Sequence, residues 1–165
     1  ACGYHRFGEM CFCSAVNYLD RFLSLYDLPV GKTWTARLVA VACLLLAAKM
    51  EEVNVPNAID LQVPASRFLF ESRTIQRMEI LILNSLKWNV KPYTPLNFVE
   101  YFLRKLTSGG GGGGGTSPPP PEPWMIGRSI QIVSTAIKGI DFLEFRPSEI
   151  AASVAVYIIS GEMQQ

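Results

Sequence analysis

The sequence contains little that could carry catalysis or hold a metal. It has one histidine and four cysteines among 165 residues. A thiol hydrolase needs a cysteine activated by a histidine, and His5 stands close to the start of the sequence. Cys2, His5, Cys11 and Cys13 lack the paired Cys-x-x-Cys spacing of zinc sites. The glycine run 109–115 lacks the Lys-Ser/Thr of a phosphate-binding loop. We therefore expect no enzymatic activity, no metal site and no cofactor.

Charge is also sparse, and neither sign dominates. Lys and Arg together number 15 against 14 Asp and Glu, which gives a net charge of +1. We therefore do not expect nucleic acid to be the main partner, because proteins that bind nucleic acid carry a strongly basic surface. The longest uncharged apolar run, Leu38 to Ala48, has 11 residues, and a membrane span needs about 20. The first residues lack the apolar core of a secretory signal, and so few cysteines favour a reducing compartment.

Apolar residues recur at helical spacing along most of the sequence, and no long segment alternates with a period of two. The expected helices are 8–26, 32–51 (with Thr33 as N-cap), 71–86, a segment opened by Thr94-Pro95, 124–140, and 148–160 opened by Pro147 and Glu149. In the first helix the predicted inner face is Phe12, Ala15, Val16, Leu19, Phe22, Leu23 and Tyr26. The second helix is apolar on all sides, so we expect it at the centre of an all-α bundle.

Residues 107–123 are rich in glycine and proline and mark the clearest boundary. They predict a linker between a first domain at 1–106 and a second at 124–165. Gly109 to Gly115 should form flexible coil, and Pro118 to Pro121 should form polyproline II. One interpretation is a docking site for a proline-binding module. The other, favoured by composition alone, is an expanded surface loop.

Two charged residues occupy positions where the helical period calls for apolar ones. Glu79 shares a face with Ile75 and Ile82, and Lys49 closes the apolar run. Burying such a charge without a partner is costly. Either each residue belongs to an internal ion pair or a face edge, or the two are polar anchors within an apolar docking surface. Asp20 raises a similar question: it is either half of an exposed charge pair with Arg21 or a buried carboxylate that needs a basic partner.

Several segments resemble parts of the cyclin box, and they occur in the same order as in that family. These are Val16–Ser24 (its second helix), Leu46–Glu52 (the end of its third), Arg77–Trp88 (its fifth), Thr94–Phe102 (the opening of the second repeat or the approach to it) and Asp141–Ala151, which is similar to plant-type D cyclins in particular. The fold implied is a cyclin-box helical bundle, with the first repeat nearly complete and the second truncated.

The resemblance also implies a function. Cyclins activate cyclin-dependent Ser/Thr kinases and catalyse no reaction themselves. The implied role is a regulatory subunit in G1/S cell-cycle control, in the nucleus and cytoplasm. A cyclin-dependent kinase would be the partner, kinase inhibitors would be further candidates, and nucleic acid and membrane would not be contacted directly. Lys49 and Glu79 would hydrogen-bond the kinase backbone beside its mobile regulatory helix. The side chains that would pack on that helix are Met50, Leu83, Trp88 and Val90.

The sequence departs from the family in three places. The first helix of the box, which carries Met-Arg-x-x-Leu-x-x-Trp in the family, is mostly missing. Arg37 stands where the family has a glutamine. The Leu-x-Cys-x-Glu segment, which D cyclins use to bind retinoblastoma-type proteins, is also missing. We therefore expect a fragment with only about two helices of the second repeat. A truncated chain without function is one alternative. A cyclin-fold adaptor like some general transcription factors is another, although that function calls for a basic face.

Overall fold

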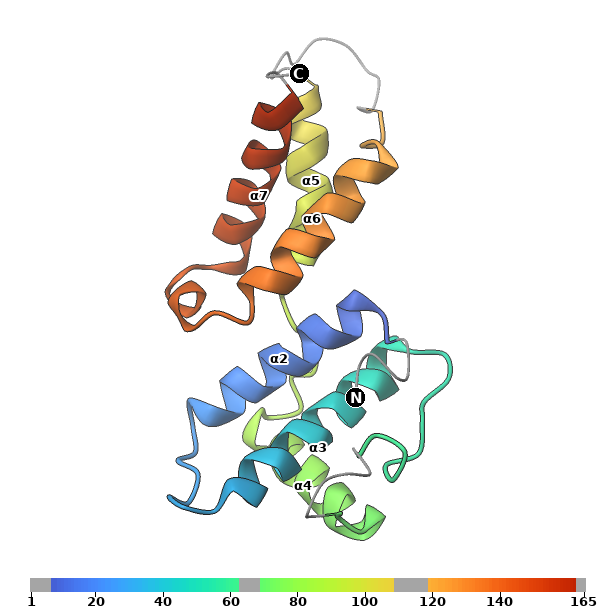
Figure 1. Cartoon of the computed structure of the whole chain (residues 1–165), viewed down its shortest axis with the longest axis vertical. Coiled ribbons are helices and arrows are strands. Elements are labelled where there is room, and N and C mark those ends of the chain that lie inside the picture. The colour runs from blue at the N-terminus through green and yellow to red at the C-terminus, as the bar shows by residue number, and fades with distance from the viewer. Residues whose placement is uncertain (1–6, 63–68, 109–118, 163–165) are drawn as a thin grey trace. The chain divides into compact units, whose positions relative to one another are not determined.

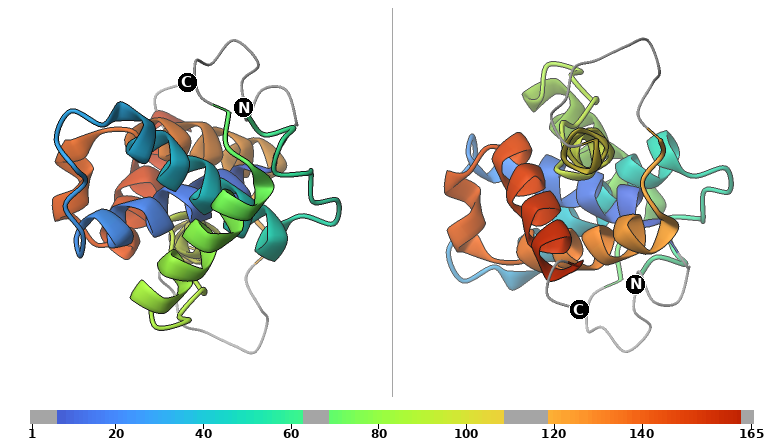
Figure 2. Two further views of the ribbon diagram at one scale, coloured as in Figure 1. Left: turned by 90° about the horizontal axis from the view of Figure 1, so that it is seen from below. Right: turned by 90° about the horizontal axis from the view of Figure 1, so that it is seen from above.

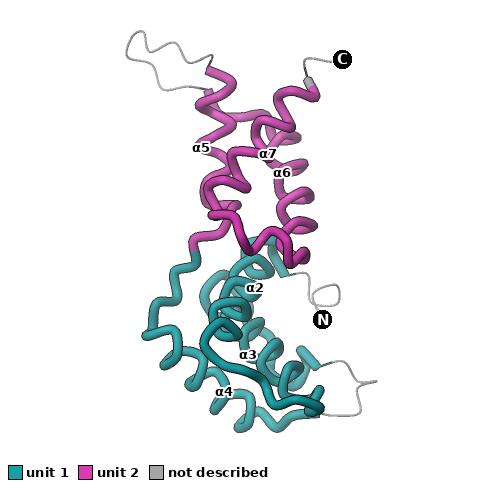
Figure 3. The backbone as a smooth tube through the Cα atoms, turned by 90° about the vertical axis from the view of Figure 1, so that its left-hand side faces the viewer, with its two compact units in different colours: residues 1–92 teal, residues 93–165 magenta. Residues whose placement is uncertain are grey.

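The computed structural model describes residues 7–62, 69–108 and 119–162. Every regular element in these ranges is helical, which confirms the predicted all-α class. The chain divides into two compact units, residues 1–92 and 93–165, which Figure 3 draws in different colours. Gly109 to Gly115 lie outside the described residues, so both interpretations of that run remain predictions.

The first unit is built around one apolar helix. It contains α2 (Glu9–Leu23), α3 (Thr33–Glu51) and α4 (Ser72–Ser85), coloured blue to green in Figure 1. α3 packs against both α2 and α4, and the additional views in Figure 2 show the same arrangement. Ala42, Ala47 and Ala48 are fully buried and let the neighbouring helices approach closely, whereas Ala40 is exposed. The prediction of a central helix at 32–51 is confirmed.

α3 is long and apolar enough, by length and composition alone, to cross a membrane. Its buried residues include Leu38, Val39 and Leu45, which belong to the core of the first unit. Packing between α2 and α4 therefore accounts for its apolar composition without any need for a bilayer.

The buried face of α2 is rotated from the predicted one. Its core positions are Cys11, Ala15, Tyr18 and Phe22. Of the predicted stripe, Ala15 and Phe22 are buried, Phe12, Val16 and Leu19 are partly buried, and Leu23 and Tyr26 are exposed. Burial of Tyr18 is possible because its hydroxyl donates to the Val90 carbonyl oxygen at 2.6 Å. A polar partner distant in sequence therefore sets which face of α2 turns inward.

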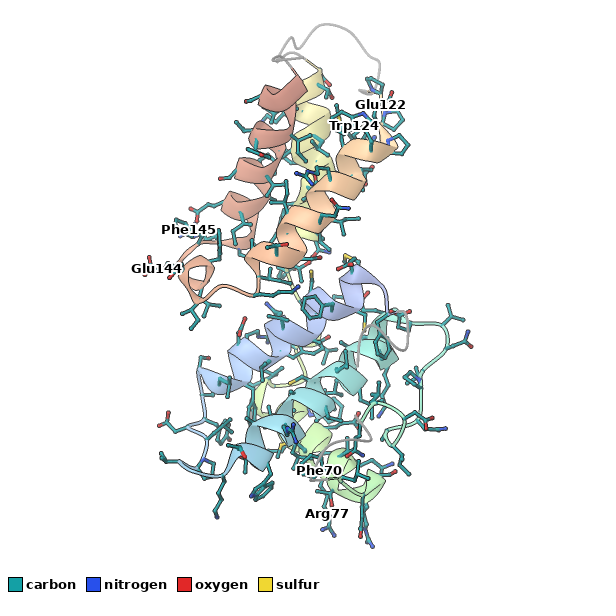
Figure 4. All side chains as sticks on the ribbon, in the orientation of Figure 1. Phe70, Arg77, Glu122, Trp124, Glu144 and Phe145 are labelled. Carbon is teal, nitrogen blue, oxygen red and sulfur yellow. The ribbon has the colours of Figure 1, made fainter. Side chains whose placement is uncertain are left out.

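Helix boundaries differ from the predicted ones by a few residues. α2 ends at Leu23, three residues before the predicted end, and Thr33 is the first residue of α3 rather than its N-cap, which is Lys32. The segment 57–61 forms turns. Phe70 lies just before α4 and is labelled in Figure 4. The Gln62 side-chain amide donates to the Phe70 carbonyl at 2.8 Å and accepts the Phe70 N–H, which fixes the chain just before the helix.

The second unit contains α5 (Leu96–Thr107), α6 (Pro123–Ala136), the 3-10 helix η1 (Ile140–Glu144) and α7 (Pro147–Glu162). α5 packs against α7 and α6. The predicted first domain ran to residue 106, but the division lies between Pro92 and Tyr93, so α5 belongs to the second unit. The predicted cap at Thr94 is also shifted, since α5 begins at Leu96 with Pro95 as its N-cap.

The ends of α6 and α7 follow from local chemistry. α6 stops at Ala136 instead of the predicted Ile140, because Gly139 adopts an extended conformation and the chain then turns into η1. A Cβ at Gly139 would lie 3.1 Å from the Phe142 ring, which favours glycine there. α7 begins at Pro147, and the Glu149 carboxylate accepts the Arg146 backbone N–H at 2.8 Å. The prediction that Pro147 and Glu149 open this helix is confirmed.

Two buried thiols and one buried phenol hydroxyl in the first unit lead us to expect a loss of stability at alkaline pH. Burial raises the pKa of the Cys13 and Cys43 thiols from 9.0 to about 12, and that of the Tyr18 hydroxyl from 10.0 to about 12. The unfolded chain releases these protons at the ordinary pKa values, whereas the folded chain retains them. Their contribution to stability is therefore complete below about pH 9 and is lost as the pH rises toward 12.

We expect the free energy of unfolding, measured with urea, to fall steadily as the pH rises above about 9. A variant with Cys13→Ala, Cys43→Ala and Tyr18→Phe should show a flatter dependence over the same range. A wild-type profile that stays level to about pH 11 would contradict the assignment.

Candidate functional site

The two charged residues flagged in the sequence meet in the structure. Lys49 lies in the last turn of α3 and Glu79 in the middle of α4. The Lys49 Nζ lies 2.7 Å from Glu79 Oε1 and 2.8 Å from Oε2. One ammonium therefore satisfies both carboxylate oxygens. This pairing explains how Glu79 can share a buried face with Ile75 and Ile82.

The pair is asymmetric toward solvent. The Glu79 side chain is 6% exposed, and that of Lys49 is 44% exposed. An ammonium has three hydrogens and Lys49 makes two hydrogen bonds to Glu79, so it has the capacity for a third. Of the two residues, Lys49 is therefore the one that faces outward. Glu79 lies beneath it and fixes its position.

The end of α3 is tied to the start of α2. The Ser14 hydroxyl donates to Glu51 Oε1 at 2.9 Å, and the Gly8 backbone N–H donates to Glu52 Oε1 at 2.7 Å. Glu51 is the last residue of α3, in the same turn as Lys49, and Glu52 is the C-cap. These bonds restrain the C-terminus of α3 and, with it, the backbone of Lys49. Sequence analysis noted both glutamates in a motif and assigned them no role.

The four predicted apolar contact residues divide into two kinds. Met50 is 53% exposed and Trp88 is 64% exposed. Leu83 and Val90 are partly buried and pack against the core of the first unit. The structure therefore presents two large apolar side chains to solvent and places the other two beneath the surface. Whether these residues contact a partner remains a prediction.

The chain leaves α4 through an unusual turn. The Lys87 N–H donates to the Asn84 carbonyl at 3.0 Å, and the Trp88 N–H donates to the Leu83 carbonyl at 2.8 Å. This is the pattern of a Schellman helix end, which normally has glycine in the left-handed conformation. Here Lys87 (φ 52°) and Trp88 (φ 57°) are both left-handed. A side chain in that region costs about 1–2 kcal/mol, so tertiary contacts must hold the turn.

Tyr18 supplies one of those contacts. It is fully buried, and its hydroxyl donates to the Val90 carbonyl at 2.6 Å. The bond joins α2 to the segment just after the turn. Tyr18 was not among the predicted residues, because the predicted inner face of α2 passed beside it. The sequence offered one indication of its burial: Tyr18 is a large aromatic residue next to Leu19, which belongs to the predicted inner face.

The remaining polar candidates do not form a site. The Asp20 carboxyl is partly buried, burial raises its pKa, and it forms no ion pair with another described residue. Arg21 donates to Asn17 Oδ1 instead, so the first of the two alternatives for Asp20, an exposed pair with Arg21, is not formed. Cys11 and Cys13 are buried in α2, while Cys2 and His5 lie outside the described residues.

The left-handed turn makes a prediction about stability. Lys87→Gly should stabilise the chain by about 0.5–1 kcal/mol, because glycine adopts positive φ without a Cβ clash. Thermal or urea unfolding measures the change. Lys91→Gly is the matched control, since Lys91 is exposed and has no positive φ. It should destabilise or have no effect, and a loss of stability in Lys87→Gly would contradict the assigned conformation.

Comparisons with known proteins identify similar sequences. The family profile "Cyclin, N-terminal domain" matches residues 1–91. Cyclin-D4-1 of Arabidopsis thaliana is 53% identical over 167 residues, a match that covers 100% of this chain and 51% of that protein. Cyclin-D4-2 of the same plant is 51% identical over 164 residues, covering 98% and 51%. Cyclin-D4-1 of Oryza sativa subsp. japonica is 49% identical over 163 residues, covering 96% and 42%. The chain spans about half the length of the curated relatives it matches.

Proposed function

The chain belongs to the cyclin family, with D-type cyclins among its relatives, and we propose that it binds and activates a cyclin-dependent Ser/Thr kinase at the G1/S stage. Cyclins are regulatory proteins rather than enzymes. The observation that carries the proposal is the Lys49–Glu79 pair, in which a buried carboxylate holds a half-exposed ammonium at the surface. Such an arrangement suits recognition of a protein backbone, because its geometry is set before the partner arrives.

The proposed mechanism is a shift of the kinase population. A kinase needs a Lys–Glu ion pair, contributed in part by its mobile regulatory helix, before phosphoryl transfer can occur. A partner that binds only the active position of that helix favours the active state. Moving the kinase from 1:99 to 99:1 requires about 5.5 kcal/mol of differential binding. Two exposed apolar side chains and an oriented charge can supply an energy of this order.

Each residue of the site has a proposed part. Lys49 donates its remaining hydrogen to a kinase backbone carbonyl. Glu79, whose side chain is 6% exposed, mainly orients Lys49, and its oxygens keep lone pairs for a kinase backbone N–H. Met50 and Trp88 contact the regulatory helix directly. Leu83 and Val90 support that surface from the core side. The nuclear and cytoplasmic location implied by the resemblance remains a prediction.

Exchanging the two charges tests the site. Lys49→Glu with Glu79→Lys keeps an internal ion pair but reverses donor and acceptor toward a partner. We expect helix content, measured by circular dichroism, to stay close to that of the wild type. Affinity for a purified cyclin-dependent kinase should fall by about 30-fold or more, since a charged contact to the partner is lost.

The Arg104–Glu100 pair in α5 provides a matched control. Both of its side chains are substantially exposed, so Arg104→Glu with Glu100→Arg should leave folding and kinase affinity unchanged. Wild-type affinity in the Lys49/Glu79 exchange would remove the site assignment. A wild-type chain that binds no cyclin-dependent kinase in a panel would overturn the proposed function itself.

A further inference from the structure

Trp88 is exposed but restrained from several directions. Its side chain is 64% exposed, and its indole Nε1–H donates to the Asn84 side-chain Oδ1 at 3.1 Å. Its backbone N–H donates to the Leu83 carbonyl at 2.8 Å. The ring and the backbone are therefore both held by groups of α4, although the ring faces solvent. A tryptophan that merely fills surface would need neither restraint.

The restraint extends along the whole turn. Lys87 and Trp88 are both left-handed, which is unfavourable for residues with a side chain. Val90, two residues further on, is fixed through its carbonyl by the buried Tyr18. The chain therefore holds an unfavourable backbone conformation between two fixed points. Backbone strain of this kind persists only where the surrounding structure imposes it, and it is common at functional sites.

Holding an exposed aromatic ring has a consequence for binding. Ordering a mobile side chain at an interface lowers affinity, and a side chain that is already ordered avoids this loss. Tryptophan is among the residues that most often dominate an interface. In the free chain, the fixed indole leaves most of its surface in water, since Trp88 is 64% exposed. The benefit of fixing it appears only when a partner covers the ring.

We propose that Asn84 is a positioning residue that fixes the Trp88 indole as a preformed anchor for the kinase. This inference rests on the proposed function, because the partner is the kinase assigned there. Asn84 acts through Trp88 and makes no contact of its own with the partner. It stands four residues before Trp88, and the left-handed turn at Lys87 and Trp88 places the indole N–H within hydrogen-bond distance of the Asn84 side chain.

The first measurement concerns the chain alone. The chain contains three tryptophans, so the ¹⁵N-labelled protein gives three indole N–H signals, and Trp88→Phe assigns one of them. We expect the Trp88 indole to show a rigid heteronuclear NOE in the wild type. Asn84→Leu removes the acceptor and should lower that NOE. Asn84→Asp keeps an oxygen acceptor and should restore it. Asn89→Leu changes an exposed asparagine beside Trp88 and should leave the NOE unchanged.

The second measurement concerns affinity for the kinase. Asn84→Leu should weaken binding by about 3- to 10-fold, the range expected for loss of one ordered side chain. Asn84→Asp should bind within about 2-fold of the wild type. Trp88→Ala should weaken binding by about 30-fold or more. If Asn84 acts only through Trp88, then Asn84→Leu should have no further effect when added to Trp88→Ala.

The outcomes separate this inference from the proposed function. A mobile indole and weaker binding in Asn84→Leu, with no added effect in the double variant, support the positioning role. If Asn84→Leu leaves the Trp88 indole NOE unchanged, the positioning role is overturned while the kinase assignment stands. The same holds if Asn84→Leu weakens kinase binding as much in the Trp88→Ala background as in the wild type. If the wild-type chain binds no kinase, the proposed function fails. In that case a rigid Trp88 indole would still be held by Asn84, but it would contact no kinase, and the inference fails as well.

Discussion

The ion pair between Lys49 and Glu79 is the constraint on which the site depends. Glu79 lies on the face of α4 that packs against α3, where an unpaired carboxylate is strongly unfavourable. Breaking a fully buried pair typically costs about 3–5 kcal/mol, and the cost here is smaller because the Lys49 side chain is 44% exposed. The packing of α4 on α3 and the position of the Lys49 ammonium are therefore coupled. A change that separates the two helices also releases the Lys49 ammonium from the position that Glu79 fixes.

Polar side chains around the pair determine the ends of its helices. Glu51 and Glu52 tie the end of α3 to Ser14 and Gly8, and Gln62 holds the chain just before α4. None of these bonds buries much apolar area, so their contribution lies in the positioning of the helix ends. Apolar packing alone permits small shifts of one helix along another, because many apolar contacts are nearly equivalent. Directional bonds at the helix ends favour one arrangement, and a recognition site needs one arrangement.

The sequence predicted what short-range patterns determine. Helices 33–51 and 72–85 were predicted to within one residue because their apolar positions repeat with the helical period. Lys49 and Glu79 were noticed because each breaks that period. Tyr18 was missed because its partner, Val90, lies 72 residues away and no local pattern reports such a contact. The turn at Lys87 and Trp88 was missed because glycine, the usual sign of a left-handed residue, is absent there. The assignment of α5 to the second unit depends on packing between helices and was also beyond local patterns.

The boundary of the first unit bears on how the site is maintained. The family profile ends at residue 91, and the first compact unit ends at residue 92. Lys49, Glu79 and Trp88 all lie within this unit, and so do Tyr18 and Asn84, which restrain the turn. The hydrogen bonds described above for the site therefore join groups of the first unit. These bonds restrain residues of α2, α3, α4 and the turn that follows α4, so these elements together set the geometry of the site.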